Sequence, residues 1–296
     1  MKKRKTKENL FAFCFIFPSL IAFCFFMFWP LLRTIYLSFF DWNMIKPVKK
    51  FVGLQNYITL LQDDLTYRVL GNTILYIMIL LVMNFVLPYI VSFILSFIIK
   101  KGKGFYKTAF FLPSVISLVV GSILYVWILN PVTGPIAIIL KFFNVQLPMW
   151  SKSEGIVIVI LSLITSWKVF GYNFIIVLGG VMGVSQEVIE AAKLDNVSDF
   201  KIFTQIILPM SSATGVYVFI ITIVQGLQYV FTPIKVVTQG GPNYASSNLI
   251  YQSYHEAFTL YKTGEASAFS TMTMALFIVL LVLEFKFVEK GVYYEN

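Results

Sequence analysis

The sequence predicts an all-α polytopic membrane protein with about six transmembrane helices. Hydrophobic residues make up 58% of the chain and charged residues only 12%, and the mean hydropathy is +0.81. A soluble protein would carry about twice that charged fraction. The 30 phenylalanines and 16 tyrosines suit lipid-facing and interfacial positions. The apolar residues also fall into long runs, which indicates membrane spans.

A helix needs about 20 apolar residues to cross the hydrocarbon core of a bilayer. Such runs occupy residues 10–31, 69–98, 105–129, 155–178, 210–231 and 267–288. The first run is longer than the roughly 7–15 residues of a signal-peptide core, and no small-residue cleavage site ends it cleanly. We therefore expect an uncleaved first helix and a single transmembrane domain over 1–296. Pro18, Pro88 and Pro113 are tolerable there, because neighbouring helices can bond the carbonyl groups that a proline releases.

The positive charges predict the orientation of the chain. Two basic clusters lie at the N-terminus and around the first short loop: Lys2, Lys3, Arg4, Lys5 and Lys7, and Lys100, Lys101, Lys103 and Lys107. Such clusters beside spans stay on the cytoplasmic side. Six spans then place both termini in the cytoplasm, with loops 99–104 and 179–209, and leave 32–68, 130–154 and 232–266 outside. Because these clusters adjoin spans, we expect membrane lipid and not nucleic acid around them.

The sequence contains no pattern typical of a catalytic or metal site. His255 is the single histidine, and Cys14 and Cys24 lie in one apolar run. Neither a metal site nor a disulfide framework can be built from these residues. No HExxH or GxSxG motif occurs, so we expect neither an enzyme nor a metalloprotein.

Residues 187–209 form a polar, amphipathic interruption between two apolar runs. Ser185 can cap a short helix with Glu187 in its first turn. This helix is expected to place Val188, Ala191 and Ala192 on one face. Two adjacent alanines would leave a shallow surface that another backbone can approach closely.

The second half of this interruption predicts another short helix. Asn196 can end the first helix in a left-handed conformation, and Ser198 can cap the second. The apolar stripe of the second helix is Phe200, Phe203, Ile206 and Ile207, and Pro209 marks the turn into the next span. On physical grounds alone, the segment suits either a protein partner or the lipid headgroups.

The spacing within this segment closely resembles the EAA loop of binding-protein-dependent ABC importers, where a permease docks on its ATPase. The matching residues are Glu190, Ala191, Ala192, Asp195, Phe203, Ile206, Leu208 and Pro209. Asn196 and Val197 stand where the family usually has Gly-Ala, and Asn can supply the same positive-φ turn. The resemblance implies that the ATPase-coupling residues are Glu190, Ala191, Ala192, Asp195, Asn196, Phe203 and Pro209.

The rest of the chain resembles the first permease subunit of the carbohydrate-type importers, which include maltose-like and glycerol-3-phosphate-like systems. The matching segments are Phe17-Pro18-Ser19, Trp29-Pro30, Ser38-Phe39, 51–57, Asn72-Thr73, Trp167-Lys168, Gly171-Tyr172-Asn173, 238–242 and the C-terminus from Phe287. The resemblance implies the type I ABC importer permease fold. It also implies a permease that moves a sugar or oligosaccharide by alternating access across a bacterial or archaeal cell membrane.

The resemblance further implies the partners of this chain. They are a second permease subunit in a heterodimer, two copies of a cytoplasmic ABC ATPase, and an extracytoplasmic solute-binding protein. The sequence has no Gly-x-x-x-x-Gly-Lys-Ser/Thr loop. We therefore expect no cofactor in this chain and ATP bound by a separate ATPase subunit.

Polar residues within the runs are candidates for the substrate path, because such groups usually face a bundle interior. They are Ser114, Ser117, Lys168, Tyr172, Asn173, Thr222, Gln225, Gln228 and Tyr229. Hydroxyls, amides and aromatic rings suit a sugar, and the resemblance places Ser114, Tyr172, Thr222 and Tyr229 on its path. Each residue could instead bridge packed helices. Lys168 could bind an anionic substrate, but Trp-Lys also occurs at this place in carriers of neutral sugars, which favours a structural or gating role.

The alternative function is an ion-coupled secondary transporter of small polar solutes. Proton or sodium coupling usually needs a carboxylate within the membrane. The six runs contain none near their centres, and Glu284 lies close to the inner end of the last run. The sequence therefore favours the ABC importer.

Overall fold

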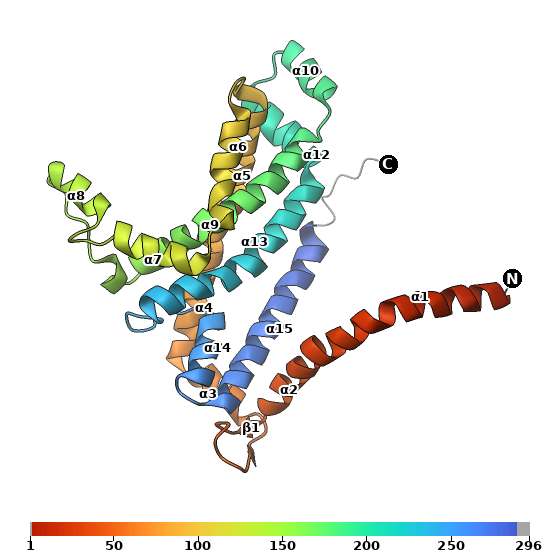
Figure 1. Ribbon diagram of the computed structural model, residues 1–296, viewed down its shortest axis with the longest axis vertical. Helices are drawn as coiled ribbons and strands as arrows, with labels where there is room; N and C mark the ends of the chain where they lie inside the picture. The colour runs from red at the N-terminus through yellow and green to blue at the C-terminus, as the bar shows by residue number, and fades with distance from the viewer. Residues whose placement is uncertain (1, 289–296) are drawn as a thin grey trace. The chain divides into compact units, whose positions relative to one another are not determined.

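The described part of the chain is almost entirely helical (Figure 1). A computed structural model describes residues 2–288, with the side chains of residues 13–283 and of Lys286. The side chains of the N-terminal basic cluster and all of residues 289–296, which entered the predictions of orientation and subunit type, lie outside the described part. The chain divides into two compact units, Met1–Asp63 with Ser253–Met274 and Asp64–Gln252 with Ala275–Asn296. The single domain expected over 1–296 stays a prediction.

The first unit begins with a long helix and continues into a small hairpin. Helices α1 (Lys2–Phe23) and α2 (Trp29–Leu37) are joined by the π-helical segment η1 (Cys24–Phe28), and are followed by strands β1 (Phe40–Asp41) and β2 (Lys50–Phe51) and helix α3 (Gln55–Gln62). The strands are antiparallel, with Phe40 opposite Phe51. Buried Asn56 donates from Nδ2 to the carbonyls of Ser38 at 2.8 Å and Phe40 at 3.0 Å. These bonds fix the turn after α2.

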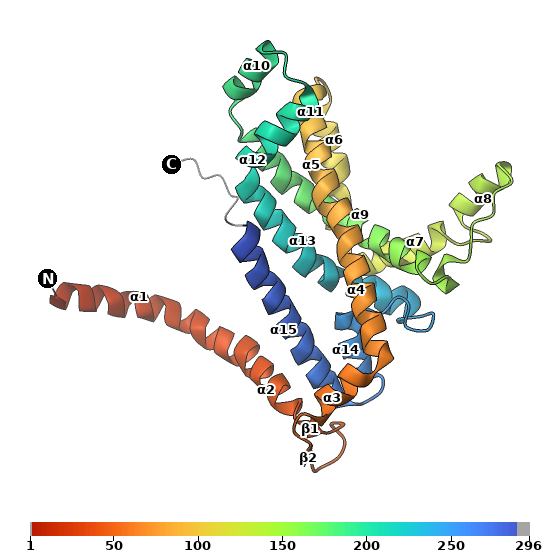
Figure 2. The same ribbon diagram turned by 180° about the vertical axis from the view of Figure 1, so that it is seen from behind.

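The second unit holds most of the remaining elements. They are α4 (Asp64–Leu81), η2 (Val82–Val86), α5 (Leu87–Phe93), η3 (Ile94–Ile98), α6 (Lys103–Phe111), η4 (Leu112–Val115), α7 (Leu118–Ile128), α8 (Pro135–Phe142), η5 (Trp150–Lys152), α9 (Ile156–Met182), α10 (Gln186–Leu194), α11 (Asp199–Lys201), η6 (Ile202–Ile207), α12 (Leu208–Met210), α13 (Ser212–Pro233) and η7 (Ile234–Thr238). Helices α14 (Leu249–Phe258) and α15 (Thr263–Val288) contain residues of both units. Helices α5, α6 and α13 all pack on α9, and α10 lies at one end of this group (Figures 1 and 2).

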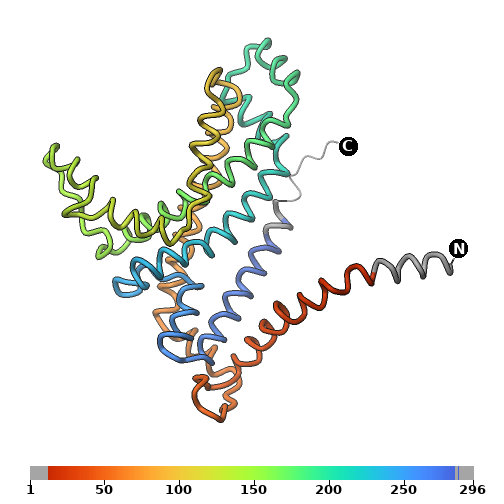
Figure 3. The backbone as a smooth tube through the Cα atoms, viewed as in Figure 1, coloured from red at the N-terminus to blue at the C-terminus, as the bar shows by residue number. Residues whose placement is uncertain are grey.

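Five described helical stretches are long and apolar enough to cross a membrane: Phe13–Leu37, Asp64–Ile98, Ile156–Met182, Ser212–Thr238 and Thr263–Leu283. A sixth span requires Lys103–Val115 and Leu118–Ile128 to be counted together, and these two pieces are bent by 102° (Figure 3). The all-α polytopic class with about six spans is confirmed. The expectation of one continuous helix over 105–129 is wrong.

The break in the third span lies just after Pro113, where α6 tightens into the 3-10 segment η4 and the helix then ends. After η4 the backbone becomes extended at Ile116, with ψ 140°. Carbonyl groups released from a helix within a bilayer need another donor. Lys168 of α9 supplies it, because its Nζ donates to the carbonyls of Ser114 at 2.8 Å and Ile116 at 2.7 Å. Ser114 Oγ donates in return to the Lys168 carbonyl at 3.0 Å.

Pro88 also releases a carbonyl, in the second span. Because Pro88 has no N–H, it cannot bond the carbonyl of Asn84, four residues earlier. Asn173 Nδ2 of α9 donates to that carbonyl at 2.7 Å and to Thr222 Oγ1 of α13 at 2.9 Å. The Asn84 side chain lies in η2 and donates from Nδ2 to Ser166 Oγ at 2.8 Å. A buried polar network therefore joins the second span to α9 and α13.

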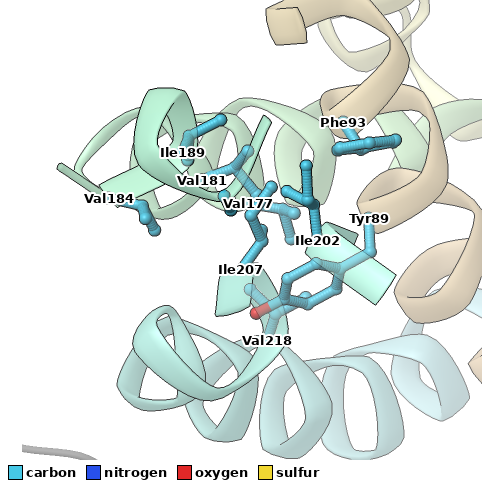
Figure 4. Close-up of a cluster of buried hydrophobic side chains, with 10 residues drawn as sticks. Tyr89, Phe93, Val177, Val181, Val184, Ile189, Ile202, Ile207 and Val218 are labelled. Atoms are coloured by element: carbon cyan, nitrogen blue, oxygen red, sulfur yellow. The ribbon is translucent and has the colours of Figure 1, made fainter. Parts of the chain in front are cut away.

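A buried hydrophobic cluster joins α10 and η6 to three spans (Figure 4). Ile189 and Ala192 come from α10, and Ile202 and Ile207 come from η6. Their partners are Tyr89 and Phe93 of α5, Val177 and Val181 of α9, and Val218 of α13. The amphipathic segment is therefore packed on the spans along one of its faces.

Gly171 allows the broken span to approach α9 closely. A Cβ at this position would meet the Phe110 carbonyl oxygen and would lie 2.5 Å from Ser114 Oγ. Gly179, on the same helix, has nothing within 4 Å of its Cβ position. Close packing therefore requires a glycine at position 171 but not at position 179.

Gly171→Ala is expected to destabilise the protein by about 1–3 kcal/mol, because the backbone of the third span must move to admit the methyl group. Gly179→Ala is the matched control and should be neutral or stabilise the helix by about 0.5–1 kcal/mol. Thermal unfolding of both variants in the same detergent measures the difference. Equal unfolding midpoints would contradict the close contact.

Candidate functional site

Five of the nine predicted substrate residues line one cavity of about 350 Å³. They are Ser114 from η4, Lys168 and Tyr172 from α9, and Gln225 and Tyr229 from α13. Each pair on α9 and α13 is four residues apart, so its members share a helix face. The volume falls within the roughly 300–1,000 Å³ of ligand pockets. The cavity offers a hydroxyl group, an amide and two phenol rings beside one amine.

Lys168 both supports the broken span and contributes to this cavity. Its ammonium has three N–H donors, and the carbonyls of Ser114 and Ile116 use two of them. None of the seven described lining residues carries a carboxylate. The bonds to the broken span agree with the structural role favoured for Lys168. Its third N–H donor is not used by these bonds, and Lys168 lines the cavity, so this donor could bond a solute.

The other four predicted substrate residues lie outside the cavity. Asn173 and Thr222 are fully buried and bonded to each other, which is the helix-bridging role that the sequence left open for them. Ser117 is exposed just before α7, and Gln228 is exposed on α13. Neither is among the residues that line the cavity.

Three residues around the cavity were not predicted. Phe111 and Val169 complete its wall, and the side chain of Tyr217 of α13 interacts with that of Tyr172. Phe111 lies three residues before Ser114, so helical spacing could have identified it. Tyr217 contacts a different helix, and nothing in the local sequence signals that contact.

A larger hollow of about 580 Å³ lies along α5 and α13. Phe85, Ile90, Phe203 and Phe219 are among its mostly apolar lining residues. Such a wall suits lipid or a packed helix more than a polar solute. The polar lining of the smaller cavity, and not volume, therefore identifies the candidate substrate site.

Helix α10 presents two different faces. Ile189 and Ala192 are buried in the cluster of Figure 4. The outward face consists of exposed residues at spacing i, i+3, i+4 and i+7: Glu187, Glu190, Ala191 and Leu194. Leu194 is 84% exposed, although an apolar side chain normally gains by burial. The outward face of α10 therefore combines two carboxylates with one exposed leucine.

The expected grouping of the alanines needs correction. Val188 and Ala191 are exposed but Ala192 is buried, so the three do not share one face. The helix geometry accounts for this, because Ala192 follows Ile189 by three residues on the inward side. Ser185 and Ser198 hold the expected N-cap positions, but neither side chain makes a capping hydrogen bond.

The remaining predicted coupling residues lie at and after the end of α10. Asp195, Asn196 and Pro209 are exposed, and Asn196 has φ 56°, the positive-φ turn expected there. Phe203 is half-buried, with its ring centroid 5.2 Å from that of Phe93. Phe200 is 74% exposed beside this group and was expected to pack in the apolar stripe.

Asn72-Thr73, a segment that carried the family resemblance, contacts the loop that directly follows another such segment, residues 238–242. Asn72 Nδ2 donates to the carbonyls of Tyr244 and Ser247, both at 3.0 Å. Thr73 Oγ1 accepts the Leu249 N–H at 3.0 Å, and Tyr76 donates its hydroxyl to the Ser246 carbonyl at 2.9 Å. The start of the second span therefore holds the loop that follows residues 238–242.

No family model matches the chain, but full-length relatives do. It is 30% identical over 288 residues to "Probable ABC transporter permease protein YurN" of Bacillus subtilis (strain 168), covering 96% of this chain and 98% of that protein. It is 26% identical over 288 residues to the sn-glycerol-3-phosphate transport system permease protein UgpA of Agrobacterium fabrum (strain C58 / ATCC 33970), covering 97% of each.

Solved structures agree with the fold. A chain from a bacterial ABC transporter involved in the import of the acidic polysaccharide alginate matches with a TM-score of 0.83 at 20% identity, covering 97% of this chain and 98% of that one. The helical architecture is therefore that of an ABC importer permease. With 30% identity across nearly the full length of both sequences, this chain belongs to the ABC transporter permease family and is a membrane transport protein, not an enzyme.

Proposed function

We propose that this chain is the first permease subunit of an importer for a sugar or oligosaccharide. The observation that carries the proposal is the cavity lined by Ser114, Lys168, Tyr172, Gln225 and Tyr229. Aromatic rings can pack on the apolar faces of a sugar, while hydroxyl and amide groups bond its hydroxyls. A relative named for sn-glycerol-3-phosphate transport and a structural neighbour named for alginate import support a polyhydroxylated substrate.

Three kinds of partner complete the proposed importer: a second permease subunit, two copies of an ATPase that binds ATP, and an extracytoplasmic solute-binding protein. The outward face of α10 offers Glu187, Glu190, Ala191 and Leu194 to the ATPase. The most apolar window of Phe13–Leu37 has no buried residue, which leaves it for lipid or the second permease. A similar solved chain, with 19% identity and a TM-score of 0.80, comes from an alginate transporter in complex with an alginate pentasaccharide-bound periplasmic protein.

The packing of α10 supports a mechanical route between ATPase and cavity. Ile189 and Ala192 are packed with side chains of α5, α9 and α13. Helices α9 and α13 also carry five of the seven cavity residues. Close-packed side chains transmit displacement, because interiors have few voids to absorb it. A shift of α10 on the ATPase would therefore move both helices that line the substrate cavity.

The proposed location is a bacterial or archaeal cell membrane, with both termini in the cytoplasm. In this orientation α10 faces the cytoplasm, where an ATPase can reach it, and residues 239–244 face outward toward the binding protein. The basic residues before the first span and in loop 99–104 support this orientation.

Tyr172→Ala and Tyr229→Ala are each expected to slow solute uptake by roughly ten- to a hundred-fold, because a solute hydroxyl left without a partner inside the cavity costs about 1–3 kcal/mol. Uptake is measured with the solute that the cognate binding protein retains. Tyr106→Ala is the matched control, since Tyr106 is 39% exposed, close to the 45% of Tyr172, and does not line the cavity. ATPase stimulation by the binding protein should persist in all three variants. Normal uptake by both cavity variants would mean that these tyrosines only pack helices.

Cysteines placed at 191 and 192 are expected to behave differently, because Ala191 is exposed and Ala192 is buried. After the exposed native Cys14 and Cys24 are replaced by serine, Ala191→Cys should crosslink to the ATPase only in the assembled complex. Ala192→Cys should react at least about tenfold more slowly. Glu190→Lys should uncouple ATP hydrolysis from uptake without lowering the amount of protein in the membrane. Free labelling of the Ala191→Cys variant in the intact complex would show that the docking surface lies elsewhere.

Reporter fusions should give an extracytoplasmic signal after residue 245 and a cytoplasmic signal after residue 195. The reason is that one span, Ser212–Thr238, separates the two positions. An alkaline phosphatase and a fluorescent protein reporter at each position provide opposite readouts and control for expression. The reverse pattern would place α10 outside and remove it from contact with a cytoplasmic ATPase.

A further inference from the structure

A second polar pocket, of about 190 Å³, lies at the end of the second unit where α6, α9 and α10 meet η3. Its polar wall contains Lys103 and Lys107 of α6 and Gln186 of α10. Its apolar wall contains Leu95 of η3 and Met182 of α9. Nothing in the proposed substrate path uses this pocket, because none of its lining residues lines the 350 Å³ cavity.

The pocket carries two positive charges that no described carboxylate neutralises. Lys103 and Lys107 are four residues apart, share one face of α6 and are both half-buried. Lys103 Nζ donates to the Ser96 carbonyl at 2.8 Å, which holds the ammonium in place and leaves two of its donors. The ion pairs found among the described side chains, Arg68–Glu154 and Lys262–Glu265, do not involve either lysine. An anion with several acceptor oxygens would satisfy both ammonium groups.

Two further features of the wall favour an anion. Lys103 and Gln186 are each the first residue of a nine-residue helix, and neither helix has a side-chain cap, so two partial positive helix ends meet at the pocket. Ser96 also lines the pocket, and its Oγ is buried without a hydrogen-bond partner. Gln186 Nε2 is already bonded to Glu190 Oε1 at 3.1 Å, so the amide is held at the rim.

The pocket lies at the ends of two candidate membrane spans. The second span ends at Ile98 and α9 ends at Met182, and residues from both ends line the pocket or adjoin it. Met182 is 60% exposed and Ile98 is 51% exposed, so an apolar surface leads away from the charged wall. A free inorganic ion would use only the lysines, whereas an amphiphile would use both surfaces. Basic pockets between spans are known to suit anionic headgroups.

We propose that this pocket binds the phosphate group of an anionic phospholipid, with Lys103 and Lys107 as its ligands and the acyl chains on the adjoining apolar surface. Bound lipid would tie the start of α6 to the start of α10. The site is then a lipid-binding site beside the surface of α10, and it exists whether or not that surface contacts an ATPase.

The test uses the transporter complex purified through a tag on this chain, in a zwitterionic detergent. Native mass spectrometry measures the retention of added phosphatidylglycerol and phosphatidylcholine, and a separate thermal-shift series uses inorganic phosphate alone. Lys103→Gln with Lys107→Gln removes the two pocket charges. Lys100→Gln with Lys101→Gln is the matched control, since these exposed lysines belong to the same loop region but do not line the pocket.

Wild type should retain phosphatidylglycerol in preference to phosphatidylcholine. The pocket variant should bind phosphatidylglycerol about 30-fold more weakly, because each lysine is expected to contribute about fivefold to the affinity. The control pair should change affinity by less than about threefold, and Lys103→Arg with Lys107→Arg should restore binding if the glutamine variant folds poorly. Equal loss in the pocket and control pairs, or equal retention of the two lipids, would overturn the proposal. A different result would be that inorganic phosphate stabilises the complex as much as phosphatidylglycerol does, and that this effect is lost with the pocket lysines. That result would overturn the assignment to a lipid and identify the site as one for free phosphate.

Discussion

Hydrogen bonding by α9 to the broken backbones of its neighbours is the interaction on which the membrane part depends. Pro88 in the second span and the extended backbone at Ile116 in the third each leave carbonyls that no helical N–H can reach, and lipid offers no donor. Asn173 donates to the released carbonyl of Asn84 in the second span. Lys168 donates to the released carbonyls of Ser114 and Ile116 in the third span. Without α9, the second and third spans would each bury unsatisfied carbonyl groups. The polar residues of α9 are therefore as much a part of the backbone architecture as its apolar ones.

The same helix connects the two candidate functional regions. At one end, Val177 and Val181 pack in the cluster that holds α10, and nearer its middle Lys168 and Tyr172 line the cavity. The bonds that stabilise the break and the contacts that form the cavity share Ser114 and Lys168. A change in the angle between the two halves of the third span would therefore also change the cavity. Membership of the ABC permease family excludes the alternative function, an ion-coupled secondary transporter.

The helical class, the span positions and the positive-φ turn at Asn196 could be predicted because they depend on composition, run length and local backbone preference. Runs of about 20 apolar residues have few other uses. The break at Ile116 could not be placed, because a proline in a span is compatible with either a kink or a full break. The group that stabilises the full break, the Lys168 ammonium, lies 52 residues away on α9. For a similar reason, Ala192 was predicted to contact the ATPase and Thr222 to line the substrate path, although both are buried. Spacing along one helix says which residues share a face, but only the neighbouring helices decide which face is buried. Here the cluster residues of α5 and α9 cover Ala192, and Asn173 of α9 covers Thr222.

The ammonium of Lys168 has an electrical consequence for the resting membrane. It lies in the wall of a cavity between spans, and none of the described residues that line this cavity is a carboxylate. Coulomb repulsion in a medium of low dielectric constant raises the energy of any sodium, potassium or hydronium ion that enters. A polar cavity wide enough for a sugar would otherwise be wide enough for hydrated cations, which the membrane potential drives inward. The residue that holds the third span together would thus also oppose the entry of small cations into the proposed substrate cavity.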